Sequence, residues 1–335
     1  MDQVSLAPAP ASPVDGHGQP ALGAYLGHVA NVAWDALRGP SARGWLYRRL
    51  HHKRWHYCSI ANERVMFAAA VIDVGLLSSA FFYVFDRARG ELLVDRSLTS
   101  RPGRATFSPS PGEGANTRFR DRTTEIVLRR GPGSTSWQIQ VDDGPLLLDA
   151  TLDARGAPPT LCAIARIGDG GVANCTHKTV GLPASGRLRV GETTFDLAGG
   201  WGALDHTSGL LARDTRWRWA SGNGPRARFN LVDGFNGPIE NVLWLGDRVV
   251  PIGQVTFTYE RARTTAPWHI VSSDGRLELE LTPEGERRQD VNLVLARSWY
   301  VQPFGPFRGV FREEGQAPVD LAGVVGVTED HQALW

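Results

Sequence analysis

Residues 201–222 read WGALDHTSGLLARDTRWRWASG and mix acid, imidazole, hydroxyl, guanidinium and indole side chains closely. Residues 215–219 alternate with a period of two, as a β-strand does, so Thr215, Trp217 and Trp219 face one way and the two arginines the other. Two indoles on one face, with the carboxylate of Asp205 shortly before them, can line a pocket that holds an apolar ligand near a polar group. The stretch therefore predicts strands that build a binding site.

Similar short strands follow one another from Trp55 to the end of the chain. Runs rich in Val, Ile, Phe, Tyr and Trp are separated by Gly, Pro, Asp or Asn, without intervening helical periodicity, which is typical of antiparallel all-β proteins. The expected strands are 64–70, 79–85, 124–128, 137–141, 146–152, 161–167, 187–190, 193–197, 215–220, 227–232, 241–245, 254–260, 276–282, 291–298, 308–311 and 321–326. Two packed barrels that share a seam are the expected fold, and one continuous large sandwich is the alternative.

The connector 176–183 (THKTVGLP) carries Gly and Pro and divides these strands into two series. We therefore expect a tail and short lead-in over 1–44, a β-domain over 45–180, and a second β-domain with the ligand pocket over 181–335. The first twenty residues are expected to be a disordered tail. One helix is expected around 41–50, with Ser41 as its N-cap.

Composition excludes several classes of protein. The 335 residues carry 36 Lys plus Arg against 35 Asp plus Glu, so no net field attracts nucleic acid or an anionic membrane. The apolar run 65–85 is interrupted by Asp73, and no signal peptide is recognisable, so no transmembrane segment is expected. Cys58, Cys162 and Cys175 are scattered and form no CxxC motif, which predicts neither a disulfide framework nor a zinc site. A cytoplasmic location fits best.

Asp205-His206-Thr207 invites a catalytic interpretation, because a carboxylate and an imidazole can exchange protons with a substrate near neutral pH. On a strand, Asp205 and Thr207 share a face while His206 points away, so the pair is not a simple Asp–His couple. The alternative is that Asp205 and Thr207 satisfy backbone groups at a loop start.

Other candidates for ligand contact leave the same choice open. Trp217, Trp219 and Trp244 are either a ligand-lining group or plain core. Asn230 and Asn241 must find hydrogen-bond partners if buried, which can be each other, the backbone or a ligand carbonyl. Asp73, inside an apolar run, must be paired, protonated or facing a cavity, and Lys53, Arg54 and Lys178 are candidate partners.

The chain carries no recognisable cofactor or metal motif. GxGxxG before a helix, GxxxxGK[ST], GxSxG and HExxH are all missing from the sequence. Glu329-Asp330-His331 falls short of a metal ligand set, and nothing else supplies the rest at recognisable spacing. We therefore expect no cofactor and no metal.

Residues from position 53 onward match one family pattern: Lys53-Arg54-Trp55, Asp73-Val74-Gly75, Lys178, Leu182-Pro183, Gly186, 205–209, 217–222, Asn230-Leu231, Glu240-Asn241, Trp244, Phe304-Gly305, Gly326, Glu329, His331 and Trp335. With them the chain resembles a bacterial family, domain of unknown function 2804, over roughly residues 45–335. More remotely it is similar to duplicated lipocalin-like proteins, which include carotenoid 1,2-hydratases and cyclases of polyenes. That resemblance implies two tandem lipocalin-like barrels or sandwiches with little helix, and a pocket for a long apolar substrate.

The function expected first is binding of a hydrophobic small molecule, such as a lipid, terpenoid or polyene, in a tryptophan-lined cavity. The alternative is a cofactor-free hydratase, cyclase or isomerase that uses Asp205 as proton donor, with His206 as a second candidate. A third interpretation is a structural or protein-interaction module, which predicts an exposed aromatic patch and no internal cavity.

Overall fold

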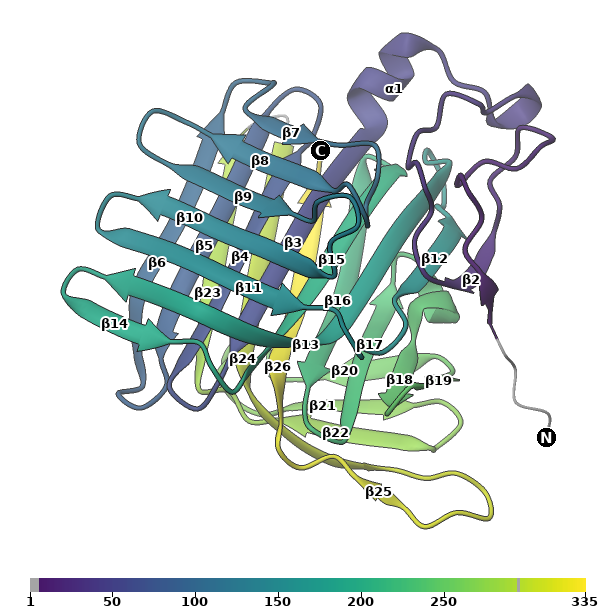
Figure 1. Cartoon of the computed structure of the whole chain (residues 1–335). Helices are drawn as coiled ribbons and strands as arrows, with labels where there is room; N and C mark the ends of the chain where they lie inside the picture. The colour runs from purple at the N-terminus through teal and green to yellow at the C-terminus, as the bar shows by residue number, and fades with distance from the viewer. Residues whose placement is uncertain (1–5, 294–295) are drawn as a thin grey trace.

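The computed structural model describes residues 6–293 and 296–335 and consists almost entirely of β-strands in two large sheets (Figure 1). Sheet one comprises β1 (Ala7–Pro8), β2 (Gly23–Leu26), β3 (His52–Ala61), β4 (Val65–Asp73), β5 (Ser78–Asp86), β6 (Glu91–Ser100), β7 (Ala105–Phe107), β8 (Asn116–Arg120), β9 (Glu125–Arg129), β10 (Ser136–Asp143), β11 (Leu146–Asp153), β12 (Leu161–Arg166), β13 (Ala173–Val190), β14 (Thr193–Asp196) and β15 (Gly200–Leu210).

Sheet two comprises β16 (Asp214–Asn223), β17 (Ala227–Gly234), β18 (Val242–Leu245), β19 (Arg248–Pro251), β20 (Val255–Thr258), β21 (Trp268–Ser272), β22 (Leu277–Leu281), β23 (Gly285–Leu293), β24 (Ala296–Phe311), β25 (Val319–Asp320) and β26 (Val324–Leu334). The helical segments are η1 (Gly39–Ser41), α1 (Trp45–His51) and η2 (Gly237–Glu240). The predicted all-β class with two tandem lipocalin-like units and little helix is confirmed.

Sheet one curls back over its own core. Its strands follow the order β6-β5-β4-β3-β15-β13-β11-β10-β9-β8-β7, and Figure 1 shows β7 to β11 crossing in front of β4, β5 and β6. Buried side chains from both arms, including Phe67, Phe82, Phe119 and Trp137, meet inside this curl. Sheet two curls in the same way, with the order β19-β18-β17-β16-β26-β24-β22-β21-β20 around its own core.

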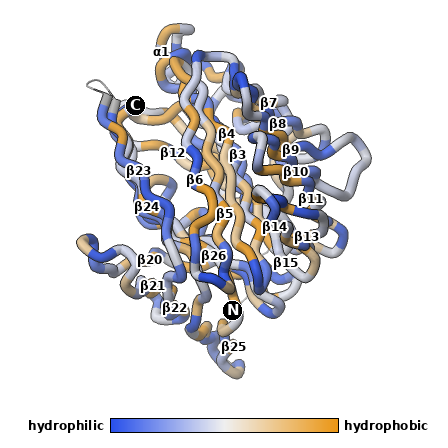
Figure 2. The backbone as a smooth tube through the Cα atoms, turned by 90° about the vertical axis from the view of Figure 1, so that its left-hand side faces the viewer, coloured by the Kyte–Doolittle hydropathy of each residue, from blue (hydrophilic) through white to orange (hydrophobic). Residues whose placement is uncertain are grey.

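The two sheets pack against each other along a seam, which is why β4 and β5 are buried on both faces. In β4, Phe67 and Ala69 belong to the core of sheet one, whereas Met66 and Ala68 contact the aromatic side chains of the seam. A strand covered on both faces is a nearly continuous apolar run, and Figure 2 shows β4 and β5 hydrophobic along most of their length. The bidentate ion pair of Arg87 with Glu284 also crosses the seam.

Three details differ from the sequence expectations. The helix begins at Trp45 after Gly44 without a side-chain cap, and Ser41 instead donates to Gln19 Oε1 at 2.7 Å. Residues 6–44, expected as tail and lead-in, pack on the body, and Val14 is buried beside other apolar side chains. Residue 180, the expected domain boundary, lies inside β13, and the chain passes to sheet two only after Leu210.

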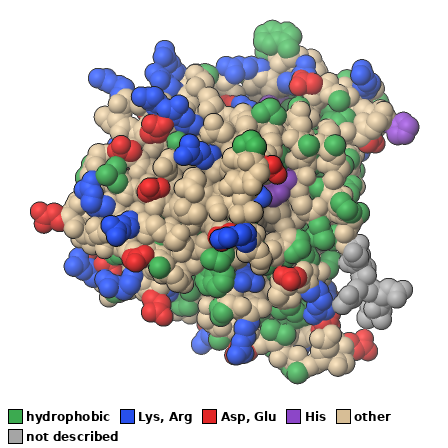
Figure 3. Space-filling view, in the orientation of Figure 1, with side chains coloured by type: hydrophobic (Ala, Val, Ile, Leu, Met, Phe, Trp, Pro, Cys, Tyr) green, Lys and Arg blue, Asp and Glu red, His purple; other side chains and the backbone are tan. Residues whose placement is uncertain are grey.

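Acidic and basic side chains are interspersed over the face seen in Figure 3. Within the described residues, no helix is long and apolar enough to cross a membrane.

Candidate active site

A pocket of about 220 Å³ lies at the seam between the two sheets. Its floor on sheet one includes a row across five neighbouring strands, in which the successive register partners are Lys178, Asp205, Tyr57, Ala70 and Phe81. Partners in adjacent antiparallel strands point to the same face, so the pairing itself brings these side chains to the pocket. Strands β16, β17, β23, β24 and β26 and the turn η2 supply the opposite wall.

Aromatic side chains form much of the wall. Trp55 of β3 stacks on Trp217 of β16, with ring centroids 5.8 Å apart, and so joins the two sheets. Tyr57 meets Trp219 edge to face at 5.5 Å, and His331 meets Trp217 edge to face at 4.4 Å. These rings give the pocket an apolar surface with electron-rich faces.

A buried ion cluster lies at one side of the pocket. Lys178 Nζ is 2.9 Å from Asp205 Oδ2 and 3.3 Å from Glu240 Oε2, and all three residues are buried. Burial alone would lower the pKa of Lys178, but the carboxylates of Asp205 and Glu240 outweigh it and raise that pKa. Burial raises the pKa of Glu240, and Lys178 opposes the rise.

Asp205 is surrounded by donors. In addition to Lys178, its carboxylate accepts hydrogen bonds from Thr176 Oγ1 at 3.0 Å, Trp55 Nε1 at 3.3 Å and Thr207 Oγ1 at 3.3 Å. The Lys178 ammonium and three hydrogen-bond donors therefore fix the position of this carboxyl group. This arrangement suits Asp205 for fixing the polar side of the pocket.

Glu329 of β26 is the carboxyl group best placed to hold a proton. Trp217 Nε1 donates to its Oε1 at 2.7 Å, and Gln302 Nε2 donates to its Oε2 at 2.9 Å. Burial raises the pKa of Glu329 to about 7, the charge of Asp205 adds to the rise, and the hydrogen bonds of Trp217 and Gln302 oppose it. A carboxyl group balanced between its two protonation states near neutral pH can act as a general acid and then as a base.

The imidazole of His331 lies in the same pocket but is held neutral. Burial, with the nearby Arg287 guanidinium, lowers its pKa to about 3, and its Nε2 lies 2.9 Å from Ser298 Oγ. Asp330, between Glu329 and His331, points away from the pocket and accepts from Tyr259. Period-two alternation therefore separates the three residues that the sequence presents as an acidic cluster with one histidine.

Some of the predicted site residues line the pocket and the others do not. Asp205, Thr207, Trp217 and Trp219 line the pocket. His206 lies on the opposite face of β15, where its ring meets His56 at 5.2 Å, as expected from its position beside Asp205.

The other predicted residues do not line the pocket, and they form ion pairs or hydrogen bonds with other parts of the protein. Asp73 pairs with Arg54 at 2.5 Å. Asn230 accepts from Trp219 Nε1 at 2.8 Å and donates to the carbonyl of Glu240, so it positions a wall residue.

Asn241 and Trp244 are likewise bound to the protein backbone. Asn241 accepts from the Val232 amide at 2.6 Å and donates to the Gly253 carbonyl at 3.0 Å. Trp244 is fully buried and donates to the carbonyl of Pro159 at 2.9 Å. Asn230, Asn241 and Trp244 therefore bind other parts of the protein, as their interpretation as structural residues predicts.

Sequence reasoning missed Glu329, Tyr57 and Glu240 as pocket residues. The sequence placed Glu329, Asp330 and His331 on a terminal strand, as β26 confirms, but they were weighed only as metal ligands and not as residues that alternate toward a pocket. Tyr57 and Glu240 reach the pocket only through pairing between strands and through the turn η2, and no local spacing marks either.

Comparisons with known proteins place the fold. A family model described as domain of unknown function (DUF2804) matches residues 8–335. No curated protein matches the chain. The crystal structure of CghA covers 98% of this chain and 98% of that chain with a TM-score of 0.60 and 11% identity.

Two further solved structures share the architecture. A putative AttH of Nitrosomonas europaea has a TM-score of 0.54 at 15% identity, and covers 88% of this chain and 96% of that chain. Kievitone hydratase from Nectria haematococca has a TM-score of 0.51 at 14% identity, and covers 88% of this chain and 93% of that chain. At these identities the likeness shows the fold alone.

Proposed function

This chain belongs to the DUF2804 family, and we propose that it binds a hydrophobic small molecule in the seam pocket and transfers a proton to it from Glu329. The reaction class is cofactor-independent hydration, cyclisation or isomerisation. The observation that carries the proposal is a buried carboxyl group, with a pKa raised to about 7, in an aromatic pocket. The name of kievitone hydratase, a protein of the same fold, is consistent with this class.

The surroundings of Glu329 suit protonation of an unsaturated ligand. The protonated carboxyl group gives its proton to a carbon–carbon double bond or a carbonyl oxygen, which leaves Glu329 as a carboxylate and positive charge on the ligand. The faces of Trp217 and Trp219 stabilise such charge through cation–π attraction. Water adds to the cation and releases a proton, or the cation loses a neighbouring proton directly. In a cyclisation, a second double bond first closes a ring and moves the charge to another carbon, which then loses a proton or takes up water. In each case the released proton returns to the Glu329 carboxylate.

Asp205 takes a different part in this proposal from the proton donor expected from sequence. With Lys178 and Glu240 it forms the polar side of the pocket, which orients an oxygen-bearing end of the ligand. We therefore assign proton transfer to Glu329 and orientation to the Lys178–Asp205 pair. Binding without reaction remains the second candidate, because the same aromatic walls can hold a ligand that is only carried.

The test compares wild type with Glu329→Gln, which keeps the side-chain shape and removes the proton. Glu278→Gln, on the exposed face of β22, is the matched control. A panel of polyenes and terpenoids is screened by quenching of tryptophan fluorescence, and bound compounds are then incubated and analysed by mass spectrometry and chromatography. We expect wild type and Glu278→Gln to convert a compound that Glu329→Gln binds but leaves unchanged. Equal conversion by all three contradicts the role of Glu329, and binding without conversion by any supports carriage alone.

A further inference from the structure

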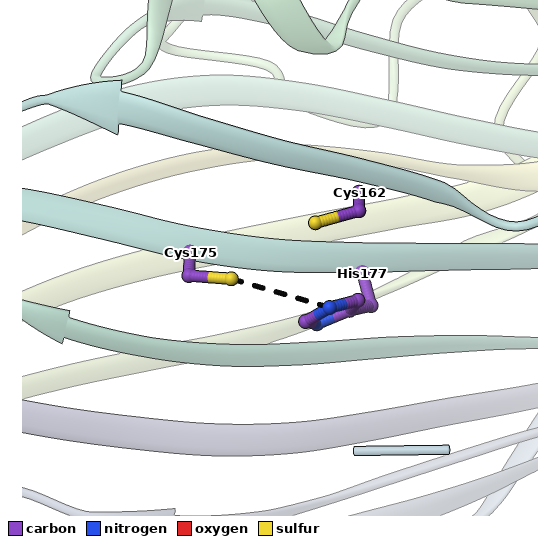
Figure 4. Close-up of side chains that lie close together, drawn as sticks. All are labelled: Cys162, Cys175 and His177. Atoms are coloured by element: carbon purple, nitrogen blue, oxygen red, sulfur yellow. Dashed lines mark hydrogen bonds between the residues drawn. The ribbon is translucent and has the colours of Figure 1, made fainter. Parts of the chain in front are cut away.

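Two cysteines and a histidine converge on the face of β13 that points away from the pocket. Cys175 and His177 are two residues apart on β13, and Cys162 lies on the neighbouring β12 (Figure 4). One ligand atom from each residue, two sulfurs and a ring nitrogen, all lie within 4.8 Å of one another. Thr176 and Lys178, which alternate with them on β13, face the pocket, so this cluster is separate from the proposed active site.

Strand pairing explains why three dispersed residues meet. Strands β12 and β13 are antiparallel, with Cys162 opposite His177 and Ile164 opposite Cys175. Residues two apart on one strand share a face, and so does a residue directly opposite one of them. The sequence shows only an isolated Cys-x-His and a distant cysteine, which is why spacing predicted no site.

The cluster is enclosed and has unused bonding capacity. Cys162 and Cys175 are fully buried, and His177 is 1% exposed. The Nδ1 atom of His177 is buried and has no hydrogen-bond partner within the described part of the chain. Its Nε2 accepts from the Val29 amide at 3.3 Å and lies 4.0 Å from Cys175 Sγ. The ring nitrogen beside Cys175 is therefore Nε2, and a cation bound by Nε2 and the two sulfurs takes the place of the long Val29 hydrogen bond.

We propose that Cys162, Cys175 and His177 bind one thiophilic cation with a filled d shell, either Zn²⁺ or Cu⁺. Thiolate and imidazole are the ligands that both ions prefer. Binding replaces the thiol protons: Zn²⁺ with two thiolates releases two protons and is neutral in total, which limits the cost of burial. Cu⁺ accepts three ligands; it forms a neutral site when one cysteine releases its proton and the other remains a thiol.

The two ions differ in what else they require. Zn²⁺ takes a fourth ligand, and the ring of His28 stacks on His177 with centroids 5.4 Å apart, while that of His206 lies at 6.0 Å. His28 belongs to the N-terminal segment, and Val29 and Trp34 of the same segment pack over the two cysteines. The ion therefore enters during folding or when this segment opens, and its binding holds the segment closed.

The experiment uses reduced, chelator-treated full-length protein under anaerobic conditions, with Zn²⁺ and Cu⁺ added separately. Bound metal is counted after desalting, the melting temperature is measured with and without metal, and X-ray absorption on the wild type identifies the ligand atoms. The variants are Cys162→Ser/Cys175→Ser and the control Cys58→Ser, whose buried thiol lies in the core of sheet one. Circular dichroism checks that each variant folds.

We expect one ion per chain in wild type and Cys58→Ser, a melting temperature several degrees higher with metal, and sulfur and imidazole scatterers around the ion. The ion that produces these results identifies the site as a zinc or a copper site. Absence of tight binding of either ion by wild type overturns the proposal. So does a wild-type absorption spectrum without sulfur ligands, a result that does not depend on whether the double variant folds.

Discussion

The indole nitrogen of Trp217 donates a hydrogen bond of 2.7 Å to Oε1 of Glu329, so one aromatic wall residue also holds the carboxyl group whose pKa burial raises to about 7. The two residues are brought together by the pairing of β16 with β26, in which Trp217 lies opposite His331 and Trp219 opposite Glu329. The ring stack of Trp217 on Trp55 links the same wall to sheet one. The aromatic wall of the pocket, the position of the Glu329 carboxyl group and the packing of the two sheets therefore depend on shared side chains.

The rate of conversion should depend on pH through Glu329. Burial raises the pKa of this carboxyl group to about 7, and only the protonated form can donate. We expect the single-turnover rate to be constant in mildly acidic solution and to fall about tenfold per pH unit above pH 7. Stopped-flow measurements between pH 5 and 9 test this. A rate that rises with pH across this range would show that the reaction begins with a carboxylate acting as base.

Stability should also depend on Glu329. A folded-state pKa above the unfolded value favours the protonated group, so this contribution is complete below about pH 4.5 and is lost as pH rises toward 7. The shift corresponds to about 3 kcal/mol of unfolding free energy. We expect Glu329→Gln to unfold with a shallower pH dependence than wild type, and Glu278→Gln to match wild type. Urea titrations at several pH values measure the difference, and parallel curves for wild type and Glu329→Gln would contradict the raised pKa.

Removal of Lys178 should destabilise the fold strongly. Lys178→Met keeps the length of the side chain but leaves Asp205 and Glu240 buried without their cation. We expect a loss of about 3–5 kcal/mol, since breaking a buried ion pair costs more than the pair contributes. Adding Glu240→Gln to Lys178→Met should restore part of this loss, which calorimetry of the two variants tests. No recovery in the double variant would show that the like charges are not the cause.

One pair of substitutions distinguishes a tryptophan that lines the ligand pocket from one that only packs in the core. Trp219→Leu removes a pocket wall, whereas Trp244→Phe alters a fully buried ring outside the pocket lining. We expect Trp219→Leu to weaken binding of an apolar ligand about tenfold or more and Trp244→Phe to reduce stability with little change in affinity. Titration calorimetry of both variants with one ligand measures this. Equal losses of affinity would place Trp244 in the site after all.

The sequence was sufficient for the fold class because period-two alternation is a local signal. It also gave the correct faces in β16, where Trp217 and Trp219 line the pocket while Arg216 pairs with the exposed Asp214. The position of Asp205 and Thr207 opposite His206 followed from the same rule.

Pairing between distant strands was not accessible in the same way. Lys178, Asp205 and Tyr57 form a row because β13, β15 and β3 are neighbours, although more than a hundred residues separate the first from the last. The meeting of Cys162 with His177 has the same origin. The raised pKa of Glu329 arises from the packing of two sheets, a tertiary effect that no motif records.

Whether the seam pocket binds and converts a hydrophobic ligand can be measured by native mass spectrometry of wild type and Glu329→Gln, purified in parallel under mild conditions. We expect both proteins to carry an apolar small molecule, with substrate on Glu329→Gln and, on wild type, a product that differs by one water or by chromatographic retention at equal mass. If neither protein carries such a molecule, and no polyene, terpenoid or fatty acid quenches their tryptophan fluorescence, the pocket is not a site for a hydrophobic ligand and the proposed function is wrong.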